Sequence, residues 1–248
     1  MGGKKVVEIA SLFDERSTFR AAIDAVLEER CGSIVAGRGC ARLDLCPFSI
    51  LAGDATAPDA RSLVADITIP RIFVDGSEWH ASIRERHTAC ALDLVRRTRF
   101  SADELDEEHL RALRRVPGEM RILPLDAASL HEAVTQLSSD LLIEAVSRDA
   151  EAFVSAGGFG FAVVQGEHFL AAATSAIVSD RHIEIQINTA AEHRRQGLAT
   201  AVGAAIVLES RIRGLEPGWD TASPASAALA RKLGFRAARE YEWLCVDS

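Results

Sequence analysis

The sequence predicts an α/β protein of the α+β kind. Its C-terminal half should hold a mixed, largely antiparallel central sheet flanked by helices, preceded by a smaller α/β region. Three strand-like runs, 159–164, 168–178 and 182–189, are joined by links of hairpin length, which indicates an antiparallel meander. Amphipathic helical patterns lie before and after this meander, so helices are expected against the sheet.

Two domains are expected. At 248 residues the chain suits one large domain or two small ones. Pro117-Gly118 ends a helical pattern, and we place the boundary there. This gives an N-terminal α/β domain over residues 1–118, expected to form one wall of an acceptor pocket, and a C-terminal domain over residues 119–248.

The first of these domains alternates short strands with helices. The patterns predict helices or helical turns over residues 17–30, 59–63, 78–87 and 105–114, and strands over residues 33–36, 48–52 and 71–74. Ser77 is the predicted N-cap of the third helix. No phosphate loop or nucleophile elbow is found here. His80 and His87 would share a helix face, but ordinary surface or core histidines are the favoured interpretation, and no metal site is expected.

The second domain begins with a strand over residues 120–125 and a helix capped by Asp126. That helix carries an apolar stripe of Leu130, Val134, Leu137 and Leu141. The order then predicted is a helix over 150–156, the three-strand meander, a long helix ending near 213, a strand over 217–221, a helix over 225–233 and closing strands from 235. Ser223-Pro224 is a favourable start for the last helix.

Composition and charge exclude several classes of function. The net charge is −8 and no long basic block occurs, which argues against nucleic acid as a partner. No apolar run approaches the roughly 20 residues of a membrane-spanning helix, and no secretory signal is seen. The five cysteines are scattered without a C-x-x-C pair, so reduced thiols in the cytoplasm are expected.

The stretch between the meander and the long helix predicts an anion site. The first N–H groups of a helix have no partner within the helix and carry the positive end of its dipole, so a phosphate docks there readily. Small side chains would let a diphosphate reach the backbone, and two arginines supply charge at the rim. The candidate residues are Arg194, Arg195, Gln196, Gly197, Leu198, Ala199 and Thr200.

The strand before this stretch has two different faces. Isoleucines at 183, 185 and 187 point one way, and Glu184, Gln186 and Asn188 point the other way. A polar row beside a phosphate loop is a candidate site for chemistry. A solvent-facing strand surface is an equally weighted alternative.

These motifs resemble the GNAT acyltransferase superfamily. Arg194-x-x-Gly197-x-Ala199 after a strand is similar to the motif by which that superfamily binds the pyrophosphate of acetyl-CoA. The order of elements from residue 120 onward matches the superfamily order, and residues 223–235 resemble its last-helix motif, which ends in Leu-Gly-Phe. Trp219-Asp220 before that helix also resembles a bacterial, zwittermicin-resistance-type group of acetyltransferases.

The resemblance implies an N-acetyltransferase that binds acetyl-CoA and acetylates an amine by direct attack in a ternary complex. The amine is expected on a small molecule rather than a protein. Amides of residues 195–200 would hold the pyrophosphate, and backbone groups of Ile187 and Thr189 would hold the pantetheine and the reacting oxygen, near a strand bulge. Ser223 and Ser226 are further predicted cofactor contacts.

Glu184 is the predicted base that takes the amine proton, directly or through water. The family's usual asparagine is replaced by Ser223, and its usual tyrosine acid by Ala230. Tyr241, the one tyrosine in the chain, is therefore the candidate acid, although a structural aromatic is its favoured interpretation and solvent the alternative donor.

The acceptor stays open, with a weak preference for cationic amines because the protein is acidic. The oligomeric state also stays open, a homodimer included. A non-catalytic acetyl-CoA-binding sensor or scaffold is the alternative function, because the usual asparagine and tyrosine are missing.

Overall fold

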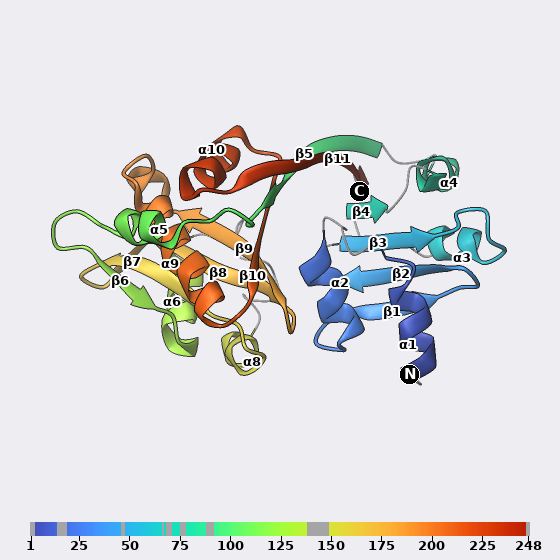
Figure 1. Ribbon diagram of the computed structural model, residues 1–248, viewed down its shortest axis with the longest axis horizontal. Helices are drawn as coiled ribbons and strands as arrows, with labels where there is room; N and C mark the ends of the chain where they lie inside the picture. The colour runs from blue at the N-terminus through green and yellow to red at the C-terminus, as the bar shows by residue number, and fades with distance from the viewer. Residues whose placement is uncertain are drawn as a thin grey trace. The chain divides into compact units, whose positions relative to one another are not determined.

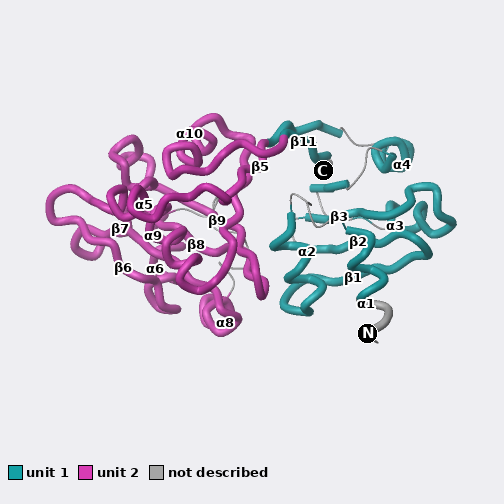
Figure 2. The backbone as a smooth tube through the Cα atoms, viewed as in Figure 1, with its two compact units in different colours: residues 1–97, 240–248 teal, residues 98–239 magenta. Residues whose placement is uncertain are grey.

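The computed structural model describes residues 3–13, 19–45, 48–65, 67, 71–74, 78–87, 92–137 and 149–246. The chain forms two compact units (Figure 2): unit 1 comprises residues 1–97 and 240–248, and unit 2 comprises residues 98–239. Strands β5 (Leu92–Ser101) and β11 (Arg236–Val246) each run from one unit into the other.

This division differs from the predicted boundary at 118/119. Helix α5 (Glu107–Leu113) packs on helix α9 (Leu198–Ile212) of unit 2, and its Leu110 is fully buried there. Pro117-Gly118 is thus a loop inside unit 2 rather than a linker. The end of the chain belongs to unit 1, because Leu244 in β11 pairs with Ile72 in strand β4.

Unit 1 is a mixed sheet in the order β1-β2-β3-β4-β11, with short helices (Figure 1). β3 and β4 are parallel, and the other neighbours in this order for which a register is given are antiparallel. Its further elements are α1 (Gly3–Ala10), α2 (Arg20–Leu27), β1 (Ser33–Ala36), β2 (Cys40–Leu45), β3 (Phe48–Gly53), α3 (Ala60–Ala65), β4 (Arg71–Val74) and α4 (Glu78–Arg86). The predicted strands and helices of this region are confirmed, whereas the predicted cap Ser77 lies outside the described residues.

Strand β2 was not expected from the sequence. Its Arg42 interrupts the apolar pattern, yet this side chain is buried, donating to the Leu63 carbonyl and pairing with Asp44 at 2.9 Å. A charged residue inside a sheet is tolerated when its donors are satisfied in this way. The long strand β5 was also missed, because its run of polar residues shows no alternation.

Unit 2 holds the strands in the order β5-β10-β9-β8-β7-β6. β6 to β9 are antiparallel, β9 and β10 are parallel, and β10 and β5 are antiparallel. Its further elements are β6 (Arg121–Pro124), α6 (Ala127–Gln136), α8 (Ala150–Ser155), β7 (Gly160–Gln165), β8 (His168–Val178), β9 (His182–Thr189), a 3-10 turn (Ala191–His193), β10 (Glu216–Thr221) and α10 (Pro224–Leu233).

Two cores cover the two faces of this sheet. Helices α5, α9 and α10 pack together on one face, where Ile183 and Val202 are fully buried (Figure 1). On the other face α6 contributes Leu130 to a separate cluster with Ala172 of β8. The predicted mixed sheet between helices is confirmed.

The predicted helix starts at Asp126 and Ser223 are also confirmed. Asp126 accepts from the Ser129 amide at 2.8 Å, and the Ser129 hydroxyl accepts from the Asp126 amide, which forms a capping box. The Ser129 hydroxyl also donates to the Asp126 carboxylate at 2.6 Å, and this bond, together with that from the Ser129 amide, holds the pKa of the Asp126 carboxyl below its ordinary value. Ser223 caps α10, while the predicted stripe residue Leu141 lies outside the described part of the chain.

In the described ranges no helix is both long and apolar enough to cross a membrane.

Candidate functional site

The turn that joins β9 to α9 has an unusual backbone. Arg195 has a φ of 62° and Gly197 a φ of 84°, both in the left-handed region. For a residue with a side chain this conformation is uncommon, and such residues cluster at functional sites. Successive N–H groups in a chain that alternates its handedness point to one side and form an anion-binding concavity.

The backbone donors of this turn find no partner among the described residues. Across the described chain, no acceptor is found for the backbone N–H groups of residues 195–200, and the first bond of α9 runs from the Ala201 amide to the Gly197 carbonyl at 3.1 Å. Leu198 and Thr200 are buried, whereas residues 194–197 are exposed. A Cβ added at Gly197 would meet nothing within 4 Å, so the space beside these amides is open. The predicted candidates 194–200 therefore share one helix N-terminus.

The rim of the turn is fixed by side chains. Arg194 Nε donates to the Thr189 carbonyl and Gln196 Nε2 to the Glu192 carbonyl, both at 3.3 Å. The Thr189 hydroxyl oxygen is buried and has no hydrogen-bond partner in the described part of the chain. A buried polar atom without a partner costs free energy, so this hydroxyl is a candidate for contact with a ligand.

Strands β9 and β10 part beside this turn. Their parallel register ends at the pair of Glu184 with Gly218, after which β10 pairs with β5 from Trp219 to Thr221. Residues 185–189 of β9 keep their partners on β8 only. An opening between β9 and β10 therefore begins at Gly218, and the edge of β9 faces it.

The hydrogen-bond pattern shows which groups line this opening. The Ala190 amide donates to the Leu170 carbonyl near the start of β8. Since backbone groups alternate between the two sides of a strand, the amides of Ile187 and Thr189 point the other way, toward the opening. The structure thus brings these two predicted residues to the same edge. The irregularity in register lies on β8, where Ala176 is the extra residue, rather than on β9.

Glu184 is held by a partner that the sequence did not predict. Both of its carboxylate oxygens accept from Arg99 Nη1, at 2.8 and 2.9 Å, and each side chain is 17% exposed. The guanidinium favours the charged form of the carboxylate. The two residues are 85 positions apart, so no local signal in the sequence could have linked them.

The other two residues of the predicted polar row, Gln186 and Asn188, differ in how deeply they are buried. Asn188 is only 3% exposed and its Nδ2 donates to the Leu137 carbonyl at the end of α6. The alternative of a solvent-facing strand surface is therefore wrong for Asn188. Gln186 and Glu184 are half-buried.

The two predicted serines lie at the start of α10. The Ser223 hydroxyl accepts from the Ser226 amide at 3.4 Å, and the Ser226 hydroxyl accepts from the Trp219 indole at 3.2 Å. Ser223 is exposed and Ser226 half-buried. Both hydroxyls have local structural roles, and their predicted contacts with a cofactor stay predictions.

Tyr241 belongs to unit 1, whereas Glu184 belongs to unit 2. The Tyr241 ring lies edge-on to Phe19, with 5.7 Å between the ring centroids, and its centroid is 6.0 Å from that of Phe73. These contacts describe a structural aromatic, and the role of a general acid stays a prediction. Among the described residues of both units, no group of three or more histidine, cysteine or acidic side chains is arranged so that it could hold a metal ion.

The sequence of the chain matches that of a known protein family. A sequence model of the GNAT acetyltransferase family matches residues 10–244, and so spans both units. The resemblance seen in residues 119–248 thus extends to the N-terminal half.

Individual relatives agree with this match. The N-acetyltransferase YdfB of Bacillus subtilis (strain 168), described as uncharacterized, is 38% identical over 86 residues, 34% of this chain and 33% of that protein. The chain thus matches about a third of the length of this curated relative.

Two solved structures share the fold. A GCN5-related N-acetyltransferase-like protein from Streptococcus suis 89/1591 is similar over 98% of this chain and 99% of that one, with 25% identity and a TM-score of 0.81. A GCN5-related N-acetyltransferase from Kribbella flavida covers 93% and 96%, with 15% identity and a TM-score of 0.65.

Proposed function

The chain belongs to the GNAT acetyltransferase family and is an acyltransferase, and from this premise we propose that it transfers an acetyl group from acetyl-CoA to the amine of a small molecule. The observation that carries the proposal is the row of amides over residues 195–200, which find no acceptor among the described residues and lie beside the opening between β9 and β10. A diphosphate is the ligand that such a helix start favours.

The residues present fit this co-substrate. The amides of residues 195–200 would bind the diphosphate, with the side chains of Arg194 and Arg195 at the rim. The amides of Ile187 and Thr189 would bind the pantetheine arm and the carbonyl oxygen of the thioester. A donor that faces this oxygen stabilises the negative charge that develops there. Ser223 and Ser226 would contact the arm from the start of α10.

Acetyl-CoA would supply an activated acyl group as a thioester. The acceptor enters as an ammonium ion and must lose a proton before its nitrogen can attack the carbonyl carbon. A C–N bond then forms, the C–S bond breaks, the nitrogen gives up a second proton and the sulfur takes one. The net reaction releases one proton, so a group that accepts protons is needed near the nitrogen.

We propose Glu184 as that group, acting directly or through a water molecule. Its carboxylate lies at the residue where β9 and β10 part. The proton for the sulfur would come from Tyr241 or from solvent. The contribution of residues 1–118 to acceptor binding stays a prediction.

The cytoplasm is the proposed site of action. The scattered cysteines, which include no C-x-x-C pair, support this compartment. The proposed acceptor is a cationic small molecule, because the chain is acidic.

Thiol release tests the proposal. The purified protein is incubated with acetyl-CoA and a panel of polyamines, aminoglycoside-like compounds and amino acids, and free thiol is measured against a reaction without acceptor. Amine-dependent thiol release, with the acetylated amine found by mass spectrometry, is the expected result. Tight binding of coenzyme A without thiol release for any amine would contradict it.

A further inference from the structure

An ion pair crosses over one strand of the unit 2 sheet. Arg99 lies on β5 and Glu184 on β9, yet β10 lies between these strands in the sheet. Arg99 Nη1 nevertheless reaches both carboxylate oxygens, at 2.8 and 2.9 Å. The ion pair therefore passes over β10 and joins the two strands on either side of it.

Gly218 makes this crossing possible. A Cβ at this position would lie 2.7 Å from the Ile183 carbonyl oxygen and 2.8 Å from Arg99 Nη2, and it would collide with Glu184 Oε2. The glycine is thus required by lack of space rather than by its backbone conformation. Gly218 is also the last residue of β10 that pairs with β9, so the ion pair marks the point where the opening begins.

We propose that Arg99 is a positioning residue for acyl transfer, which holds the Glu184 carboxylate charged and fixed at the start of the opening between β9 and β10. This inference rests on the proposed function, in which Glu184 accepts the proton of the amine. A carboxylate fixed by a charge-assisted hydrogen bond loses little freedom when it accepts that proton, and correct orientation of a catalytic group lowers the barrier.

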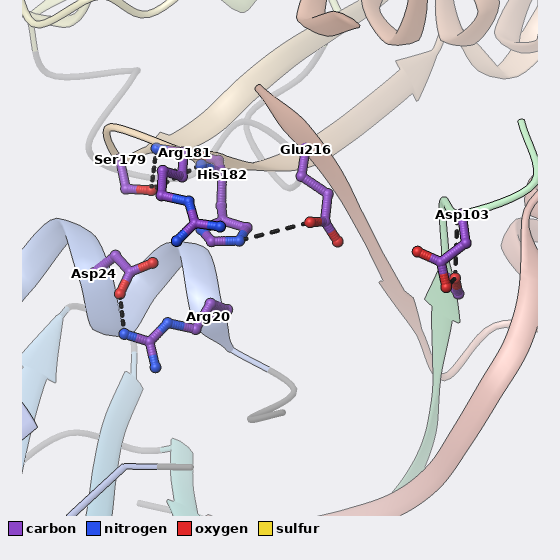
Figure 3. A network of polar contacts seen from close by, with 8 residues as sticks. Arg20, Asp24, Asp103, Ser179, Arg181, His182 and Glu216 are labelled. Carbon is purple, nitrogen blue, oxygen red and sulfur yellow. Dashed lines mark hydrogen bonds and ion pairs between the residues drawn. The ribbon is translucent and has the colours of Figure 1, made fainter. Parts of the chain in front are cut away.

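Other charged groups share this face of the sheet. His182 and Glu216 form a pair at 3.7 Å (Figure 3), and side-chain alternation places them on the same face as Glu184 and Gly218. Asp220 lies opposite Arg99 in the β10–β5 register, and on β8 the residue opposite Glu184 is the apolar Ile177. Among the groups named here, Arg99 is the one whose positive charge persists at every working pH.

Arg99→Gln and Arg99→Lys test the assignment, with Arg96→Gln as a matched control. Arg96 lies on the same strand and pairs with Glu242, but its side chain is 75% exposed and the ion pair is 3.9 Å long. For each variant, kcat and the KM of both substrates are measured between about pH 5 and 9 with an amine that the wild type acetylates. Thermal melting and coenzyme A binding are measured alongside.

We expect Arg99→Gln to lower kcat about ten-fold or more, with the KM of acetyl-CoA changed by less than about two-fold. Without the guanidinium the pKa of the carboxyl rises, so the acidic limb of the rate profile moves to higher pH. Arg99→Lys should restore part of the rate, and Arg96→Gln should match the wild type. Gly218→Ala, which displaces the pair without removing a charge, should also lower kcat.

A second readout is independent of turnover. In protein labelled with ¹³C at the glutamate carboxyl groups, the Glu184 signal is assigned by its loss in Glu184→Gln. It should titrate at higher pH in Arg99→Gln than in the wild type. If the Glu184 signal titrates at the same pH in Arg99→Gln as in the wild type, Arg99 is not a positioning residue. The same conclusion follows if the kinetics of Arg99→Gln equal those of Arg96→Gln. A wild type that acetylates no amine, while the titration still moves, overturns the proposed function instead.

Discussion

The turns at the two ends of β9 differ in whether their backbone N–H groups find hydrogen-bond acceptors. At the first turn (Figure 3), the amides of Ser179, Arg181 and His182 all donate within the turn. The backbone amide of Glu216 donates to the Arg181 carbonyl at 2.8 Å. At the other end, the amides of residues 195–200 find no acceptor in the described chain. The same strand thus joins a closed turn to an open one.

Because of this difference, groups that can bind a ligand remain at the turn after β9 and not at the turn before it. A turn whose donors are satisfied stabilises the meander and has nothing left for a ligand. A turn with left-handed Arg195 and Gly197 and an open helix start keeps its donors free, at a cost in backbone strain.

The largest effect is expected from Gly197→Val. Valine strongly disfavours the φ of 84°, so the amides should turn away and the affinity for coenzyme A should fall about 100-fold or more. Gly166→Val is the control, because Gly166 has a φ of 60° in the β7–β8 hairpin and its added Cβ would also meet nothing. Calorimetric titration measures both. Equal affinity in the two variants would show that the open turn does not bind the co-substrate.

Glu184→Gln tests the polar face of the same strand. Loss of a general base lowers turnover by about 100-fold, while binding of coenzyme A should stay unchanged. Glu216→Gln, at the closed turn, should leave both quantities at the wild-type level. Steady-state kinetics across pH decide the point, and normal turnover with an unshifted profile would remove Glu184 as the base.

A smaller effect is expected at the start of α10. Ser223→Ala removes an N-cap, which costs about 1 kcal/mol of stability. If the hydroxyl also contacts the co-substrate, affinity for coenzyme A should fall about five-fold more than in the cap variant Asp126→Ala, since a neutral hydrogen bond contributes about 1 kcal/mol. Equal affinities in the two variants would leave Ser223 with the cap alone.

The smallest effect concerns stability and pH. Ser129 lowers the pKa of the Asp126 carboxyl below its ordinary 3.8. The stabilisation is therefore present above that ordinary value and is lost as the pH falls through the lowered pKa. The difference in melting temperature between wild type and Asp126→Ala should shrink in that acidic range. A difference that is independent of pH would contradict the role of the charged cap.

Much of unit 2 could be predicted from the sequence because its signals are local. Short links indicated β8 and β9, alternating residues further supported β9, and Gly197 before an apolar helix indicated the open turn. The division into units could not be predicted, because Pro117-Gly118 has the composition of a linker and the burial of Leu110 against α9 depends on tertiary packing. Local patterns report local conformation, whereas packing between distant segments decides the boundary.

The candidate site was predicted only in part for the same reason. The amides of residues 195–200 follow from one turn, but the pairing of Arg99 with Glu184 over Gly218 needs three strands in register. No spacing along the chain reveals such an arrangement. Tyr241 was singled out because it is the one tyrosine, and its aromatic neighbours in unit 1 became visible only in the fold.

Binding of the diphosphate at the open turn can be followed through the Gly197 amide in protein labelled with ¹⁵N-glycine. The Gly197 signal is assigned by its loss in Gly197→Ala. Coenzyme A should shift this signal strongly and leave that of Gly166 unmoved, whereas pantetheine, which lacks the diphosphate, should shift neither. A Gly197 signal that stays in place at saturating coenzyme A, or that responds equally to pantetheine, would contradict the account.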